Sequence, residues 1–177
     1  MPTIRDRAGG EASESGFHKD PLDPRIPRLD GKVRAPATPA WRLVQQVLKD
    51  GGPGYLQFAI TNVCNADCGF CGFARSAMDP RRRRSVTLTE TLDVIDIARR
   101  NGIGYLLFVG GEPLVHRDLR SMMRYAAQSG IRPMICTNGS LWTERNLREF
   151  ADDGLASVIM SVVAHDVGRH EANRGLV

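Results

Sequence analysis

The sequence predicts an α/β fold with about four parallel strands, and three observations support this prediction. Apolar strand candidates alternate with amphipathic helix candidates from residue 55 to residue 163. The strand candidates are nearly continuous apolar runs, as in residues 105–109, which is typical of parallel strands covered by helices. Strict alternation of the two kinds of element gives βαβ units with right-handed crossovers.

The first part of the chain lacks these signals. Six of the ten prolines lie before residue 40, and large apolar side chains are sparse there and follow no period. Such a segment cannot bury enough apolar surface to offset the entropy lost on ordering. We therefore expect a disordered N-terminal arm over residues 1–37 and a folded domain over residues 38–177. A short helix capped by Thr38 should open the domain, with Trp41, Val44, Val47 and Leu48 on its apolar face.

Turn and cap signals bound the later elements. Thr87 and Glu90 form a capping box that should begin one helix, and Thr143 should cap another. Glycine ends helices readily because it adopts positive φ, so we expect the three helices to end near Gly102, Gly130 and Gly154. The predicted strands are residues 55–61, 105–109, 134–137 and 158–163.

Composition and charge exclude several classes of function. No apolar run approaches the ~20 residues of a membrane-spanning helix, so we expect no membrane association. The first residues carry no apolar stretch of the kind found in secretory signals, which indicates a cytoplasmic protein. A formal net charge of +4 is too small by itself to indicate nucleic-acid binding. In a reducing compartment the four cysteines are not expected to form structural disulfides.

Three of the cysteines form a cluster directly after the first predicted strand. Cys64, Cys68 and Cys71 have the spacing C-x3-C-x2-C, at the carboxyl end of the strand, where parallel sheets bind ligands. Thiolates are the usual ligands of iron–sulfur clusters, and a four-iron cluster held by three thiolates keeps one iron open to a small molecule. Gly69 and Gly72 would let backbone amides approach the cluster sulfurs.

A structural zinc site is the alternative for these thiols. It would need Cys136 or His116 as its fourth ligand. Zinc sites usually pair their cysteines as two C-x2-4-C units, and a second pair is missing from this sequence. Cys136 lies in an apolar strand candidate, where a small buried hydrophobic role is the simpler interpretation.

With these motifs the sequence resembles the radical S-adenosylmethionine (radical SAM) superfamily. The cysteine loop fits the family pattern C-x3-C-x-aromatic-C, with Phe70 at the aromatic position. Residues 110–113 match the GGEP motif after the second strand, and residues 137–139 match the TNG turn after the third. A serine followed by spaced polar residues resembles the family's S…D…H…RG stretch. These residues are Ser161, Asp166, His170, Asn173, Arg174 and Gly175.

This resemblance covers residues 55–175 and implies a fold, two cofactors and a reaction. The fold would be a partial (βα) barrel. The three cysteines would hold a [4Fe-4S] cluster, and S-adenosylmethionine would bind its open iron. One electron would then cleave the cofactor to a 5′-deoxyadenosyl radical, which abstracts hydrogen from a substrate. The likeness is greatest to peptide-modifying and cofactor-maturation enzymes. The S-adenosylmethionine contacts would come from Gly110, Gly111, Glu112, Asn138, Ser161 and Phe70.

The resemblance also implies partners and a departure from the family. The partners would be a small-molecule or peptide substrate and an electron donor of the flavodoxin or ferredoxin type. The family core usually has six βα units, so the chain looks incomplete at its C-terminal side, with its last strand an exposed sheet edge. A non-catalytic iron–sulfur remnant and a zinc-stapled binding module therefore stay open as alternatives. The run from Arg81 to Arg84 is either a solvated loop or a docking site for an acidic donor or a phosphate-bearing substrate.

Overall fold

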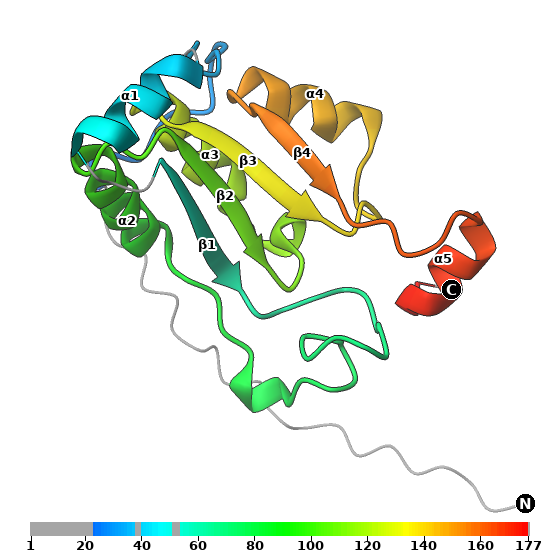
Figure 1. Cartoon of the computed structure of the whole chain (residues 1–177). Helices are drawn as coiled ribbons and strands as arrows, with labels where there is room; N and C mark the ends of the chain where they lie inside the picture. The colour runs from blue at the N-terminus through cyan, green and yellow to red at the C-terminus, as the bar shows by residue number, and fades with distance from the viewer. Residues whose placement is uncertain (1–22, 38–39, 51–53, 177) are drawn as a thin grey trace, which may run out of the picture.

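The computed structural model describes residues 23–37, 40–50 and 54–176, and in this part of the chain it confirms the predicted α/β fold. Four parallel strands form one sheet in the order β1-β2-β3-β4 (Figure 1). None of the described helices is long and apolar enough to cross a bilayer. The elements are α1 (Ala40–Asp50), β1 (Tyr55–Thr61), α2 (Leu88–Arg100), β2 (Tyr105–Gly110), α3 (Leu119–Gln128), β3 (Arg132–Thr137), α4 (Glu144–Asp152), β4 (Ser157–Met160) and α5 (Val167–Arg174), with 3-10 turns at Pro80–Arg82 and Pro113–Val115.

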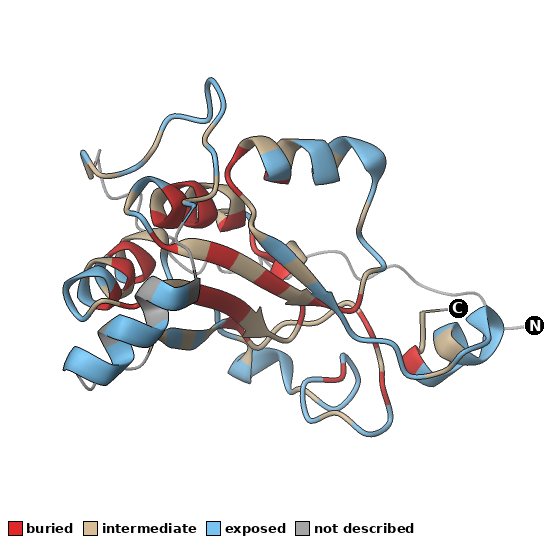
Figure 2. Ribbon diagram, turned by 45° about the horizontal axis from the view of Figure 1, so that its top comes forward, coloured by how far each residue is buried: buried red, intermediate tan, exposed pale blue. Residues whose placement is uncertain are grey.

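The hydrophobic core lies between one face of the sheet and the helices α2, α3 and α4 (Figures 1 and 2). Alternate strand residues point to this face, because successive side chains of a strand lie on opposite sides. Ile60, Leu106, Phe108 and Ile135 are fully buried there. They pack against Ile95 and Ala98 of α2, Leu119, Met122, Met123 and Ala126 of α3, and Phe150 of α4.

The opposite face of the sheet is only partly covered by described residues. Cys136 pairs with Ile159 across β3 and β4, and both side chains lie on this face. Cys136 is half-buried, and Ile159 is 41% exposed. The expectation of a buried Cys136 was therefore wrong, because this cysteine points away from the helices. The apolar side chains of Trp41, Val44 and Leu48 on α1 are also exposed.

The predicted starts of α2 and α4 and the predicted ends of α2, α3 and α4 are confirmed. Thr87 and Thr143 each accept a hydrogen bond in a capping box, and Gly102, Gly130 and Gly154 follow their helices with positive φ. The last strand is shorter than predicted: β4 ends at Met160 rather than at residue 163. Its neighbour β3 ends at Thr137, and the amide of Ser161 donates to the carbonyl oxygen of Thr137, after which no strand partner is described.

Part of the predicted disordered arm is ordered on the domain. Arg25 donates hydrogen bonds to Asp93 and Asp96 of α2, at 2.8 and 2.9 Å, and also pairs with Asp23. Val33 donates its amide to the carbonyl oxygen of Asp152 at 2.7 Å. The expectation of disorder is therefore wrong for residues 23–37, which ion pairs and backbone bonds hold in place. Residues 1–22 and Thr38 lie outside the described residues, and the domain boundary at residue 37 stays a prediction.

A buried ion pair connects this segment to two helices. Asp153, 1% exposed, accepts hydrogen bonds from Arg120 and Arg124 of α3 at 2.6 and 2.8 Å. Arg124 also donates to the backbone carbonyls of Asp30 and Gly31. The arginine is almost fully buried, so its charge depends on these acceptors.

We expect Arg25→Ala to lower the free energy of unfolding at neutral pH. Hydrogen bonds from Arg25 lower the pKa of Asp23. For Asp96, burial raises the pKa, but the hydrogen bonds from Arg25 and Tyr125 outweigh this effect, so that its pKa is also lowered. This stabilisation is complete above the unfolded carboxylate pKa of about 3.9 and is lost as the pH falls through the lower folded values. Urea unfolding should show that the loss of unfolding free energy in Arg25→Ala shrinks from pH 7 to pH 3. The control Arg28→Ala should show no such loss at any pH. A deficit independent of pH would contradict the ion-pair origin.

We expect Asp153→Ala to destabilise the chain by about 3–5 kcal/mol, because it removes the carboxylate from a buried arginine. Asp152→Ala is the matched control, since the neighbouring aspartate pairs with Lys32 on the surface. Exposed pairs contribute about 0–1 kcal/mol. Chemical denaturation followed by circular dichroism measures both. Equal losses of unfolding free energy in the two variants would show that the buried ion pair stabilises the chain no more than the exposed pair does.

Candidate functional site

The cysteine loop leaves the sheet at the carboxyl end of β1, as predicted. Cys68 is buried, Cys64 and Cys71 are half-buried, and all three are free thiols. The loop folds back on itself, because the amide of Cys71 donates to the carbonyl oxygen of Cys68 and the amide of Arg75 donates to that of Ala66. Three unpaired thiols are thus held on one short, ordered turn.

Backbone amides surround the thiols and keep two of them hydrogen-bonded. The amide of Ala66 donates to Cys64 Sγ and the amide of Phe73 donates to Cys71 Sγ, each at 3.4 Å. Gly69 and Gly72 were expected to permit such contacts, but an added Cβ at either position would meet nothing within 4 Å. The expected hydrogen bonds from backbone amides to cysteine sulfurs are therefore present, but their donors are Ala66 and Phe73 rather than the glycines.

The electrostatics of the thiols show which groups face them. Burial raises the pKa of Cys64, the hydrogen bond from the Ala66 amide lowers it, and the nearby Glu112, Cys68 and Cys71 raise it, so that the pKa lies above its ordinary value. A bound metal centre would reverse this, because its positive charge favours the thiolate forms. The donor set therefore fits an iron–sulfur cluster, which needs thiolates near amide donors.

The GGEP loop lies directly against the chain that leads into the cysteines. The amide of Gly111 donates to the carbonyl oxygen of Thr61 at 2.8 Å, and that of Glu112 donates to the carbonyl of Val63 at 2.9 Å. Gly110 has a φ of 139°, and an added Cβ would lie 2.1 Å from the Thr61 oxygen. At Gly111 it would lie 2.2 Å from the Val63 oxygen. Only glycine permits this close approach of two backbones.

Glu112 joins the GGEP loop to the TNG loop. Its side chain is fully buried and accepts hydrogen bonds from Thr137 Oγ1 at 2.7 Å, from the amide of Asn138 at 2.8 Å and from the amide of Leu114 at 3.0 Å. An ionised carboxylate accepts about four hydrogen bonds, so one acceptor position is left after these three. The predicted cofactor contact is therefore also a structural link between two strand ends.

Asn138 connects the TNG loop to the cysteines. Its Nδ2 donates to Asn65 Oδ1 at 2.9 Å and lies 4.0 Å from Cys64 Sγ. Three of the predicted cofactor loops, after β1, β2 and β3, thus meet at one edge of the sheet. The other two predicted contacts are more open. Phe70 is 68% exposed on the cysteine loop, and Ser161 is exposed just after β4.

Arg174 is a site residue whose role the sequence did not reveal. It is buried, its guanidinium donates to the carbonyl oxygen of Ser161 at 2.6 Å, and its own carbonyl accepts from the amide of Asp67 at 2.7 Å. An added Cβ at Gly175 would lie 2.8 Å from Asp67 Cβ. Helix α5 therefore packs on the cysteine loop (Figure 1). The arginine and glycine stood out only as part of the family stretch.

The structure leaves His116 without a free ring nitrogen for a zinc ion. His116 is buried, with Nε2 2.8 Å from the carbonyl oxygen of Val86 and Nδ1 accepting from the amide of Asp118. Both ring nitrogens thus have partners within the chain. Among the described residues, no three His, Cys, Asp or Glu side chains are grouped to hold a single metal ion.

Fold and geometry together define an α/β protein with three free thiols on a loop at the carboxyl ends of parallel strands. The radical SAM superfamily model matches residues 58–174, which include the cysteine loop, the GGEP and TNG loops and α5. The chain belongs to the radical SAM superfamily, a superfamily of enzymes.

Comparisons with individual proteins agree with this membership. The chain is 32% identical over 122 residues to a GTP 3′,8-cyclase of Synechococcus elongatus, covering 68% of this chain and 37% of that protein. It is 28% identical over 133 residues to an AdoMet-dependent heme synthase of Nitratidesulfovibrio vulgaris, covering 74% of this chain and 36% of that protein. The chain thus spans about a third of the length of these curated relatives.

Solved structures share the fold at lower identity. The Streptococcus suis protein SuiB bound to S-adenosylmethionine aligns with a TM-score of 0.57 and 21% identity, over 76% of this chain and 31% of that one. HydG, a maturase of the [FeFe]-hydrogenase, aligns with a TM-score of 0.56 and 16% identity, over 74% and 31%. These similarities confirm the partial barrel as the fold.

We expect Gly111→Ala to destabilise the chain by about 1–3 kcal/mol or more, because its Cβ would overlap the Val63 carbonyl in a packed region. Gly72→Ala is the matched control, since its Cβ would meet open space and its φ is not positive. Surface changes of that kind stay within about 0.5 kcal/mol. Urea unfolding of the cofactor-free chain measures both, and a stable Gly111→Ala chain would disprove the close approach of the two loops.

Proposed function

We propose that Cys64, Cys68 and Cys71 hold a [4Fe-4S] cluster and that the adjoining loops bind S-adenosylmethionine at its open iron. The observation that carries the proposal is the convergence of loops at the thiols: Glu112 binds Thr137 and the amide of Asn138, and Asn138 reaches Asn65 of the cysteine loop. Family membership over residues 58–174 supports the same pair of cofactors.

The chain's own groups suit this role. The buried Glu112 carboxylate has one acceptor position left, and an ammonium group such as that of a methionine moiety is a strong partner for it. Asn138 and Ser161 would offer hydrogen bonds to the ribose or the methionine carboxylate, Gly110 and Gly111 would line the amino group, and Phe70 would lie by the adenine. When bound, the cluster and S-adenosylmethionine supply a 5′-deoxyadenosyl radical for hydrogen abstraction.

We further propose a substrate class of peptides or cofactor precursors. Structures of the same fold include SuiB bound to its precursor peptide SuiA, at 20% identity and a TM-score of 0.56, and the maturase HydG. The curated relatives synthesise heme or cyclise GTP, as their names state. An electron donor of the flavodoxin or ferredoxin type would complete the system.

A non-catalytic iron–sulfur protein is the second candidate. It is favoured by the open surroundings of the sites proposed for the adenine and the methionine carboxylate, where Phe70 is 68% exposed and Ser161 is also exposed. Such a protein would bind the cluster but not hold S-adenosylmethionine productively. Activity on reduction separates the two candidates.

The decisive variant is Cys71→Ser, with Cys136→Ser as its matched control because both thiols are half-buried and only the first is a proposed ligand. After anaerobic reconstitution, the parent chain and the control should hold about four irons per chain. Under dithionite and S-adenosylmethionine they should release 5′-deoxyadenosine. Cys71→Ser should lose most of the iron and reduce product to background, measured by iron analysis and chromatography.

Other outcomes decide against the proposal in different ways. An iron-loaded chain that releases no 5′-deoxyadenosine would favour the non-catalytic candidate. A colourless chain holding one zinc would overturn both. Equal loss of iron in the two serine variants would show that the cysteine loop is not the specific ligand.

A further inference from the structure

The net positive charge of the chain is concentrated in one short segment. Residues 75–84, the basic segment, contain five arginines and one aspartate, which equals the formal net charge of +4 of the whole chain. The rest of the chain therefore carries no net charge. The segment begins four residues after Cys71, the last of the three clustered cysteines.

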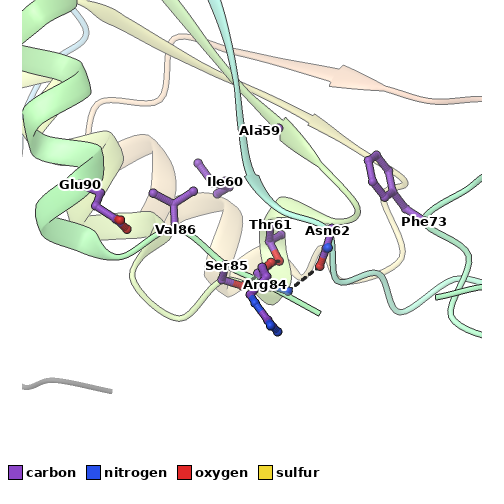
Figure 3. Close-up of a pocket in the computed structure, with 9 residues that line it drawn as sticks. All are labelled: Ala59, Ile60, Thr61, Asn62, Phe73, Arg84, Ser85, Val86 and Glu90. Atoms are coloured by element: carbon purple, nitrogen blue, oxygen red, sulfur yellow. Dashed lines mark hydrogen bonds between the residues drawn. The ribbon is translucent and has the colours of Figure 1, made fainter. Parts of the chain in front are cut away.

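Hydrogen bonds hold both ends of the basic segment beside the residues around Cys64, at the start of the cysteine loop. At one end, the amide of Arg75 donates to the carbonyl oxygen of Ala66 at 3.0 Å. At the other, Asn62 donates to the carbonyls of Arg82 and Arg84 and accepts from the Arg84 amide at 2.7 Å (Figure 3). Asn62 lies two residues before Cys64, so the segment has a fixed position next to the proposed cluster.

The guanidinium groups of the basic segment face solvent rather than carboxylates. Arg81, Arg82 and Arg84 are exposed, and within the described residues none of the run from Arg81 to Arg84 forms an ion pair with a carboxylate. The segment's own Asp79 accepts from the backbone amide of Arg81. The fold thus uses the backbone of the segment and also the guanidinium groups of Arg83 and Arg84, which donate to backbone carbonyl oxygens. The guanidinium groups of Arg81 and Arg82 remain available to a partner.

Apolar surface lies next to these charges. Phe73, on the cysteine loop, is 40% exposed. Together with Arg84, Ile60 and Val86 it lines a shallow pocket of about 350 Å³ beside β1 (Figure 3). Glu90 also lines this pocket, so its border carries one charge of each sign. A small apolar area within polar surroundings is typical of a brief protein–protein contact.

We propose that the basic segment, with Phe73, is the docking surface for an acidic electron-donor protein of the flavodoxin or ferredoxin class. This inference rests on the proposed function, because a redox cluster requires a donor. In the docked pair the reduced donor loses one electron and the cluster gains it, with no group transferred to the chain. Opposite charges accelerate such encounters by 10-fold or more and make them sensitive to salt.

A protein fits this surface better than a nucleic acid does. Nucleic-acid binding usually spreads Lys and Arg along a face so that several phosphates are neutralised in register. Here the net positive charge is confined to ten residues beside the cysteine loop, and the basic and acidic residues of the rest of the chain balance. Proximity to a redox centre is what an electron donor requires.

The test reverses two charges whose side chains make no hydrogen bond or ion pair within the described residues. Arg81→Glu/Arg82→Glu changes the net charge of the iron-loaded full chain by the same amount as the control Arg99→Glu/Arg100→Glu. The control arginines are exposed in the last turn of α2, at the opposite end of the sheet from the cysteine loop. Anaerobic stopped-flow mixing with reduced flavodoxin at low salt measures cluster reduction.

The docking variant should reduce the second-order rate constant at least tenfold, the control should change it less than twofold, and salt should slow the parent chain. Equal slowing of both variants, or of neither, would overturn the proposal. Dithionite tests the proposed function separately, because it needs no docking: a parent chain that releases no 5′-deoxyadenosine with dithionite disproves that function alone.

Binding of oxidised flavodoxin, followed by flavin fluorescence, tests docking without any turnover. Its affinity should fall at least tenfold in Arg81→Glu/Arg82→Glu and stay within twofold in the control, whatever the dithionite result. Unchanged affinity in the docking variant would overturn the proposal. So would an RNA hairpin whose binding is lost in that variant while flavodoxin binding is kept, which would assign the surface to nucleic acid.

Discussion

The site depends on one buried carboxylate. Glu112 sits at the end of β2 with no exposed surface and accepts hydrogen bonds from Thr137 and from the amide of Asn138 at the end of β3. A buried charge without such donors would cost several kcal/mol, so the two loops are fixed relative to each other by the need to satisfy it. Gly110 and Gly111 then bring this pair of loops against the chain entering the cysteine loop.

Parallel topology explains why residues far apart in the sequence meet there. Every strand of the sheet runs in the same direction, so the loops after β1, β2, β3 and β4 all open at one edge. Helices α2, α3 and α4 complete the crossovers and cover one face of the sheet. Helix α5 returns to the cysteine loop, where the carbonyl oxygen of Arg174 accepts the amide of Asp67. Segments that follow all four strands therefore lie around the cysteine loop.

The sequence predicted what local patterns encode. Apolar runs located β1 within its observed bounds, and the capping box at Thr87 and the cap at Thr143 located two helix starts. The sequence did not predict side-chain contacts between residues far apart in the chain. Arg25 and its aspartates are 68 and 71 residues apart, and no pattern in the sequence joins them. The double role of Glu112 was also missed, because a motif shows which residues gather at a site but not which hydrogen bonds hold them together.

In the basic segment, the fold requires the backbone positions but not the arginine side chain at every position. Asn62 binds the backbone of Arg82 and Arg84, contacts that any side chain at those positions could provide. Four adjacent cations repel one another, so stability alone gives no reason for arginine at each position. Arg83 and Arg84 donate to nearby carbonyl oxygens, which eases this repulsion only in part. Those hydrogen bonds account in part for Arg83 and Arg84. No contact within the described residues accounts for the side chains of Arg81 and Arg82, which is why we propose a partner of opposite charge for them.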